Sequence, residues 1–161
     1  AERVGSALGL DLLLGGQVFR ALAEERGMDV ASFGHHAADN PDVDVELDRR
    51  LGVRARQGGV VIESRLAGWI VRNEKLDGVC IGLTCTDEVR AERVAAREGI
   101  SLERALQDNV EREKTESDRY LALYGVDIAD MSIYDLVVDT GRDDPATVER
   151  KIVECVTGRG R

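Results

Sequence analysis

The chain has 161 residues, with 31 acidic and 22 basic side chains and a net charge of −9. A chain of this length can bury a core and is expected to form one domain. The acidic excess argues against a broad nucleic-acid surface, although it leaves room for one compact basic pocket. Three cysteines without a C-x-x-C pair argue against a disulfide framework. No apolar run approaches the ~20 residues of a membrane span, so we expect a cytoplasmic protein. Separately, we expect a monomer.

Short apolar runs alternate with segments of helical periodicity along the chain. Strands are predicted over 11–14, 60–63, 79–85 and 135–140. Helices are predicted over 1–8, 17–27, 32–39, 42–57, 66–73, 88–98, 102–124 and 144–156. The strand candidates show no polar–apolar alternation, which is typical of parallel strands that are covered on both faces. The order of elements predicts an α/β fold with a parallel sheet.

Several residues mark where these helices begin and end. Gly9 follows the first helix, where a glycine can take the left-handed conformation. Asp87 is the predicted N-cap of the helix over 88–98, and Ser101 is predicted to open the next helix. Pro145 suits the first position of the last helix. We expect the tail over 157–161 to fray.

The segment Glu63-Ser64-Arg65-Leu66-Ala67-Gly68-Trp69 follows a predicted buried strand. In open α/β sheets, ligands bind outside the carboxyl ends of the strands. A carboxylate there can hold a metal or a metal-bound water, and a guanidinium can grip a phosphate through two parallel hydrogen bonds. On these residues alone, a phosphate site and a simple Arg–Glu pair at a loop are equally well supported.

A glycine pair, Gly15-Gly16, ends the first predicted strand and indicates a close approach of the backbone to another group. Arg20 lies one turn later, within reach of a ligand at this turn, and Phe19 is expected in the core. His35 and His36 are adjacent, so they point in different directions on a helix and cannot chelate one metal together.

Arginines recur near strand ends and in the long charged segment over 102–124, although the protein as a whole is acidic. They are Arg20, Arg65, Arg93, Arg97, Arg112 and Arg119. A phosphate-transfer pocket needs this arrangement, because it must offset several negative charges locally. The alternative for the charged segment is a solvated helical surface with weak i, i+4 ion pairs.

Taken in order, seven short motifs resemble those of the nucleoside monophosphate kinases, and among them the archaeal-type cytidylate kinases. They are Gly15-Gly16-x-x-Phe19-Arg20, the segment from Glu63 to Trp69, Asp87-x-x-Arg90-x-x-Arg93, Arg97-Glu98, Arg119-Tyr120, Tyr124-Gly125-Val126-Asp127-Ile128 and Ser132-Ile133-Tyr134-Asp135-Leu136. Each motif alone is weak, and their combination in this order is specific. The resemblance covers nearly the whole chain.

The resemblance implies a P-loop-kinase-like, three-layer αβα fold with a parallel sheet. It also implies one kinase domain over 1–161, with a monophosphate-binding lobe over 16–57 and a lid over 97–119. The activity would be ATP-dependent phosphorylation of CMP or dCMP, with Mg²⁺ as the metal. The partners would be small nucleotides, with no nucleic acid and no membrane.

The resemblance also assigns roles to individual residues. The substrate-binding set would be Gly15, Gly16, Phe19, Arg20, Arg65 and Gly68. Arg20 and Arg65 would hold the phosphate of CMP or dCMP, and Glu63 would support Mg²⁺ through water. The lid arginines Arg97, Arg112 and Arg119 would act on the transferring phosphoryl group, and lid closure would exclude water.

Two features depart from the family pattern. The sequence has no G-x-x-x-x-G-K-[ST] loop to hold the phosphates of ATP. We infer that the first strand, which would lie between the strands at 60–63 and 79–85, and the loop after it are missing from this chain. The alternative is that another segment supplies the strand. Gln17 stands where the family more often has an acid. Two other hypotheses remain open: a kinase of another small acceptor, and a non-catalytic nucleotide-binding module.

Overall fold

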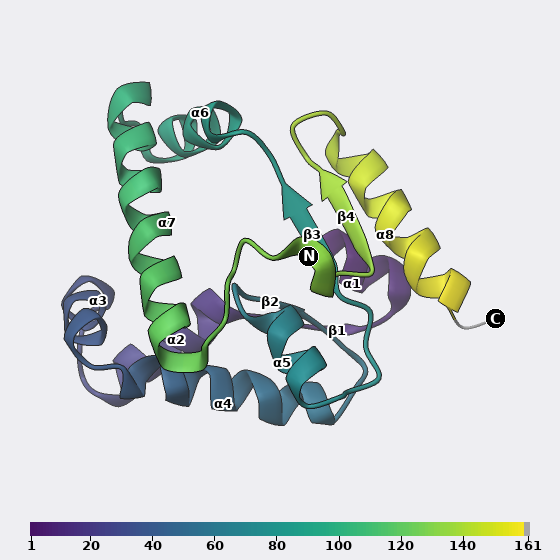
Figure 1. Ribbon diagram of the computed structural model, residues 1–161, viewed down its shortest axis with the longest axis horizontal. Helices are drawn as coiled ribbons and strands as arrows, with labels where there is room; N and C mark the ends of the chain where they lie inside the picture. Colours follow the sequence, from purple (N-terminus) through teal and green to yellow (C-terminus); the bar gives the residue numbers. More distant parts are fainter. Residues whose placement is uncertain (160–161) are drawn as a thin grey trace. The chain divides into compact units, whose positions relative to one another are not determined.

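Helices alternate with short parallel strands in the computed structural model, which describes residues 1–159 (Figure 1). The chain divides into two compact units, Ala1–Cys80 (unit 1) and Ile81–Arg161 (unit 2). The four strands form two separate two-stranded parallel sheets, β1 with β2 and β3 with β4. The predicted parallel α/β class is confirmed, and within residues 1–159 no ladder joins β2 to β3.

Unit 1 contains two strands and five helices. They are α1 (Glu2–Leu8), β1 (Asp11–Leu14), α2 (Gly15–Glu25), α3 (Val30–Asp39), α4 (Asp42–Arg56), β2 (Val60–Glu63) and α5 (Ala67–Asn73). The two strands are in parallel register from Asp11 opposite Val60 to Leu14 opposite Glu63. Their carboxyl ends therefore lie side by side, and α2 begins directly after one of them.

The core of unit 1 is built by α2, α3 and α4. Phe33, Leu22 and Leu51 are its largest fully buried side chains. Phe19 is partly buried against this core, as its apolar character predicted, with its ring centroid 4.8 Å from that of Phe33. Burial of each such side chain contributes about 1.5–3 kcal/mol, so this cluster fixes α2 on its neighbours.

An ion-pair network also joins α2 to α4. Arg50 donates two hydrogen bonds of 2.6 Å to the carboxylate of Glu25 and one of 2.8 Å to Glu46. Glu46 also accepts from Arg49 at 2.7 Å. The hydrogen bonds from Arg49 and Arg50 lower the pKa of Glu46 to about 2. These contacts orient the exposed side of α2 relative to α4.

Unit 2 contains the second strand pair. Its elements are β3 (Ile81–Thr84), α6 (Asp87–Glu98), α7 (Leu102–Tyr124), the 3-10 turn η1 (Met131–Ile133), β4 (Leu136–Asp139) and α8 (Pro145–Arg159). α8 packs on β4, while α6 and α7 pack on each other. The ring of Tyr134 lies over Gly82, where a Cβ would come within 3.1 Å of two ring carbons.

The helix ends agree with the predicted signals at most positions. Gly9, Gly99 and Gly125 take the left-handed conformation after α1, α6 and α7. Ser101 caps α7 as predicted, accepting the Arg104 N–H at 3.1 Å. The prediction for α6 was wrong by one residue: the cap is the hydroxyl of Thr86.

Several predicted boundaries also differ from the structure, and three of them have a clear physical reason. α2 begins at Gly15 and not at residue 17, because the chain passes from β1 into the helix without a loop. β3 is shorter than the apolar run over 79–85, since pairing with β4 covers only Ile81–Thr84. α8 continues to Arg159, where an ion pair of 2.5 Å to Asp135 secures its last turn. The predicted fraying of 157–159 is therefore wrong, and 160–161 lie outside the described residues.

No helix within residues 1–159 combines the length and the apolar character that crossing a membrane requires.

Candidate functional site

The start of α2 lies against the carboxyl end of β2. A Cβ on Gly15 would lie 3.1 Å from the Cβ of Ser64 and 3.3 Å from the carbonyl oxygen of Glu63. The close approach that the glycine pair predicted is thus made by Gly15, and its neighbour is Ser64. Leu14 occupies the N-cap position and supplies no side-chain acceptor. The first N–H groups of α2 therefore point out of the helix beside Ser64 without a capping side chain.

Arg20 lies one turn into α2, on its exposed side. One guanidinium nitrogen is 3.8 Å from where a Cβ on Gly16 would stand, so the side chain folds back toward the helix start. Within unit 1, Arg20 makes no hydrogen bond, ion pair or ring contact. A helix N-terminus carries partial positive charge, so a guanidinium beside it is favourable only when an anion joins them.

The predicted residues around β2 occupy the same edge of the sheet. Glu63 ends the strand with its side chain 66% exposed, and Arg65 is exposed two residues later. Ser64 Oγ accepts the N–H of Leu66 at 3.2 Å, which shapes the turn between them. Gly68 lies in the first turn of α5, and its carbonyl accepts a weak hydrogen bond from the Cys80 thiol at 3.8 Å.

Metal ligands are sparse at this edge. Across residues 1–159 no group of three or more His, Cys, Asp or Glu side chains could hold a metal ion. Glu63 stands as a single exposed carboxylate at the strand end. Mg²⁺ keeps several of its waters and is often bound through one or two carboxylates plus substrate phosphates. A water-mediated contact to Mg²⁺ therefore fits Glu63, whereas a complete protein cage does not.

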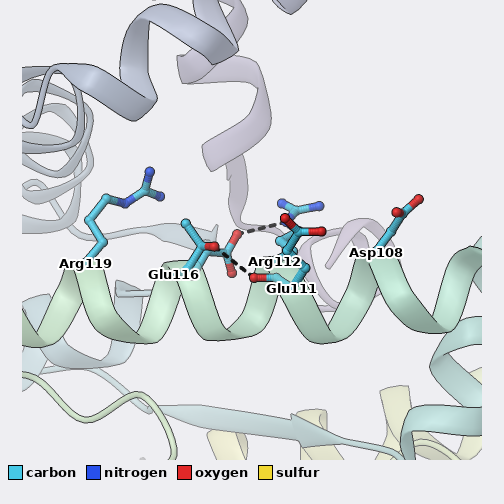
Figure 2. Close-up of a pocket in the computed structure, with 6 residues that line it drawn as sticks. Asp108, Glu111, Arg112, Glu116 and Arg119 are labelled. Carbon is cyan, nitrogen blue, oxygen red and sulfur yellow. Dashed lines mark hydrogen bonds and ion pairs between the residues drawn. The ribbon is translucent and has the colours of Figure 1, made fainter.

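The second group of predicted residues lies on α7. Arg112 and Arg119 lie on the same side of the helix, with Glu116 between them (Figure 2). Glu116 is only 7% exposed, and it accepts a hydrogen bond of 2.9 Å from Arg112, whose side chain is 69% exposed. The guanidinium of Arg119 lies 5.4 Å from the ring centroid of Tyr120. A surface pocket follows this side of α7, lined by Asp108, Glu111, Arg112, Thr115, Glu116 and Arg119.

Arg97, the third predicted lid arginine, is on a different helix. It lies in the last turn of α6 and pairs with Glu98 at 2.7 Å, with its side chain 69% exposed. The structure thus brings Arg112 and Arg119 together on one face, and it places Arg97 apart from them on α6.

A sequence model of the Cytidylate kinase-like family matches residues 42–142. The chain belongs to this family. The matched region includes Glu63, Arg65 and all three predicted lid arginines, while the start of α2 lies outside it.

Archaeal cytidylate kinases are similar over most of the chain. The enzyme of Methanopyrus kandleri is 47% identical over 149 residues, which cover 88% of this chain and 77% of the relative. That of Pyrococcus horikoshii is 45% identical, covering 92% and 76%. That of Pyrococcus abyssi is 50% identical, covering 83% and 72%. The sequence resemblance to archaeal-type cytidylate kinases is thereby confirmed, and the chain spans about three quarters of these relatives.

A solved structure shares the fold. The crystal structure of a protein from Eubacterium ventriosum superimposes with a TM-score of 0.71, covering 99% of this chain and 90% of that one. The two sequences are 17% identical, so the similarity supports the fold alone.

Sequence reasoning did not single out several residues that shape this cytidylate kinase-like chain. Ser64 was part of a motif, but its contact with Gly15 depends on strand register. Glu116 could have been found from its i+4 spacing to Arg112. Thr140 accepts hydrogen bonds of 3.0 and 2.6 Å from Arg93, across 47 residues of sequence, and no local pattern announces such a contact.

Proposed function

We propose that this chain functions as a nucleoside monophosphate kinase, which transfers a phosphoryl group from ATP to CMP or dCMP. The single observation that carries the proposal is the environment of Arg20. An arginine that has no partner within residues 1–159, beside an uncapped helix start and a strand end that is followed by Arg65, is arranged for an anion. Membership of the family favours a nucleoside monophosphate as the anion that binds here.

The other arginines of unit 1 support this reading. Arg50 pairs with Glu25 and Glu46, Arg54 with Asp11 at 2.8 Å, and Arg56 with Glu74 at 2.7 Å. Every arginine within residues 1–80 other than Arg20 has at least one hydrogen bond, ion pair, ring contact or electrostatic interaction. Acidic side chains outnumber basic ones in this chain, whose net charge is −9. An arginine that pairs with no carboxylate among the described residues is therefore unusual.

In the proposed reaction, Arg20 and Arg65 bind the phosphate of the acceptor and orient it. Their positive charge offsets the charge of the dianion and favours its attack, since phosphoryl transfer depends mainly on positioning and electrostatic stabilisation. Gly15 and Gly16 keep the helix start open to the phosphate, and Phe19 secures α2 to the core beneath it.

The arginines of unit 2 would stabilise the phosphoryl group during its transfer. Arg112 is the best placed, because it is exposed and already paired to a single carboxylate that it can exchange for a phosphate. Arg119 lies on the same face, and Arg97 would add a third charge from α6. Exclusion of water by this segment would direct the phosphoryl group to the acceptor and prevent hydrolysis.

Mg²⁺, when bound, would neutralise charge on the donor phosphates, and Glu63 would hold it through water. The sequence has no G-x-x-x-x-G-K-[ST] segment, so we assign no residue of this chain to the phosphates of ATP.

Acceptor phosphorylation tests the proposal directly. ATP-dependent formation of diphosphate is measured with CMP, dCMP, UMP, AMP and shikimate, using the 161-residue chain and a version that includes any coding sequence upstream. We expect CMP and dCMP to be preferred in the version that carries a G-K-[ST] segment. Strong preference for another acceptor would establish a different kinase, and activity in neither version would favour the non-catalytic binding module.

A binding measurement isolates the role of Arg20. We expect the chain to bind CMP more tightly than cytidine, because Arg20 and Arg65 recognise the phosphate. Arg20→Ala should remove most of that preference, about 1.5–3 kcal/mol for a charge-assisted hydrogen bond. The control, Arg150→Ala, removes an equal charge from an exposed pair on α8. Titration calorimetry checks this, and equal affinity of Arg20→Ala and wild type for CMP would refute the assignment.

A further inference from the structure

Arg90 joins the two helices that carry the lid arginines. From the first turn of α6, its guanidinium contacts Glu113 of α7 at 2.6 Å and Asp87 of its own helix at 2.5 Å. The side chain is 29% exposed, and its Nε is buried without a hydrogen-bond partner among the described residues. A partly desolvated, incompletely satisfied charge contributes little net stability, whereas it can fix the register of the groups it joins.

The lengths of the two helices show that this contact lies near the last point at which α6 can support α7. α6 has 12 residues and α7 has 23, which correspond to about 18 and 34 Å of helix. Only residues 99–101 connect them, so the end of α6 lies near the start of α7. α6 can therefore support at most about half of α7. Glu113 stands at the limit of that half, directly after Arg112.

α6 is itself attached to the strands of unit 2. Arg93 donates hydrogen bonds to the carbonyl oxygen and the hydroxyl of Thr140, just after β4. The hydroxyl of Thr140 in turn donates to the carbonyl oxygen of Thr84 at the end of β3, at 3.0 Å. A continuous set of contacts thus runs from the carboxyl ends of both strands through α6 to Glu113.

We propose that Arg90 is a positioning residue that, through Glu113, holds the segment of α7 bearing Arg112 and Arg119. The catalytic consequence rests on the proposed function, because it requires those two arginines to act on a phosphoryl group. The hold of Arg90 on α7 does not depend on that function. Without Arg90, the middle of α7 loses its ion pair to α6.

Amide hydrogen exchange of the full chain tests whether Arg90 restricts the motion of α7. Arg90→Met keeps the aliphatic stem and removes the charge, and Glu113→Gln removes the acceptor charge. Each should speed amide exchange over residues 110–124 roughly fivefold, the effect of losing one partly exposed ion pair. In the double variant, the exchange rate over residues 110–124 should be only slightly higher than in the faster single variant, because each substitution removes the same contact.

The matched control is Arg104→Met, which removes an exposed pair with Asp108 at 2.9 Å within α7 and joins no other helix. It should leave exchange over 110–124 unchanged. Equal exchange in Arg90→Met and Arg104→Met would overturn the inference, whether or not the protein phosphorylates any acceptor.

Steady-state kinetics separate positioning from simple loosening, in whichever version phosphorylates CMP. Arg90→Met should lower kcat roughly tenfold, since small displacements of catalytic groups are costly. The KM for CMP should stay within about twofold, because Arg20 and Arg65 of unit 1 are untouched. Unchanged kcat in an active enzyme would overturn the positioning role. If wild type phosphorylates no acceptor, the proposed function fails, and the exchange result alone decides the hold of Arg90 on α7.

Discussion

The contact between Gly15 and Ser64 can be tested with one methyl group. In Gly15→Ala, the new Cβ would lie 3.1 Å from Ser64 Cβ and 3.3 Å from the Glu63 carbonyl oxygen. Carbon atoms prefer separations of about 3.5–4.0 Å, so the helix start must move away from the strand. Inserting a methyl into such a contact costs about 1–3 kcal/mol. Alanine recovers up to about 1 kcal/mol through its higher helix propensity.

Gly16→Ala supplies the matched control at the neighbouring position of the same helix. Its Cβ would meet only Arg20, at 3.8 Å, which is an ordinary contact. The helix-propensity term is similar in both variants and cancels in the comparison. We therefore expect Gly15→Ala to be about 1–3 kcal/mol less stable than Gly16→Ala.

Urea unfolding of the full chain measures this difference. Trp69 is the single tryptophan and lies in α5 of the same unit, so its fluorescence reports unfolding there. The comparison requires equal m-values, since a changed slope would signal loss of two-state behaviour. Ser64→Gly should restore part of the stability of Gly15→Ala by removing the nearest atom. Equal stability of the two alanine variants would refute the contact and the juxtaposition on which the phosphate site depends.

Two further predictions concern carboxylates. The pKa of Glu46 is about 2 instead of 4.5, because Arg49 and Arg50 hydrogen-bond its charged form; its contribution to stability is complete above the unfolded value and is lost as pH falls toward 2. The urea midpoint should therefore fall more steeply between pH 5 and 2 in wild type than in Glu46→Gln, and parallel profiles would contradict this. Glu63→Gln should raise the Mg²⁺ concentration needed for half-maximal activity in an active version, whereas a normal metal response would assign Glu63 to structure only.

Local patterns were enough to predict the elements of this fold. The apolar run at 60–63 and the glycines at positions 9 and 125 mark a strand and two helix ends that the structure reproduces. The predicted N-cap of α6 was wrong because two adjacent residues compete for that position. Thr86 and Asp87 are both good caps, and the chain uses the first, whose hydroxyl accepts the Val89 N–H at 3.4 Å. Propensity cannot rank two adjacent capping residues.

The candidate site was predicted as a set of residues and not as an arrangement. Arg20 and Arg65 belong to motifs that can be identified in the sequence. Whether Arg20 has a partner depends on which groups the nearby carboxylates contact in the folded chain. The link from Arg90 to Glu113 spans 23 positions and depends on the helix packing. Such contacts follow from tertiary structure, so a single sequence gives no signal for them.

The charge distribution is compatible with the proposed phosphate site in an acidic protein. Most arginines of unit 1 are neutralised in place, as Arg54 is by Asp11 and Arg56 by Glu74. The net charge of −9 opposes nonspecific binding of polyanions. Arg20 keeps an unopposed charge at a helix N-terminus, which costs stability in the empty protein. In the proposed site, a bound phosphate would offset that cost, so part of the affinity for the anion would be stored in the fold before the anion arrives.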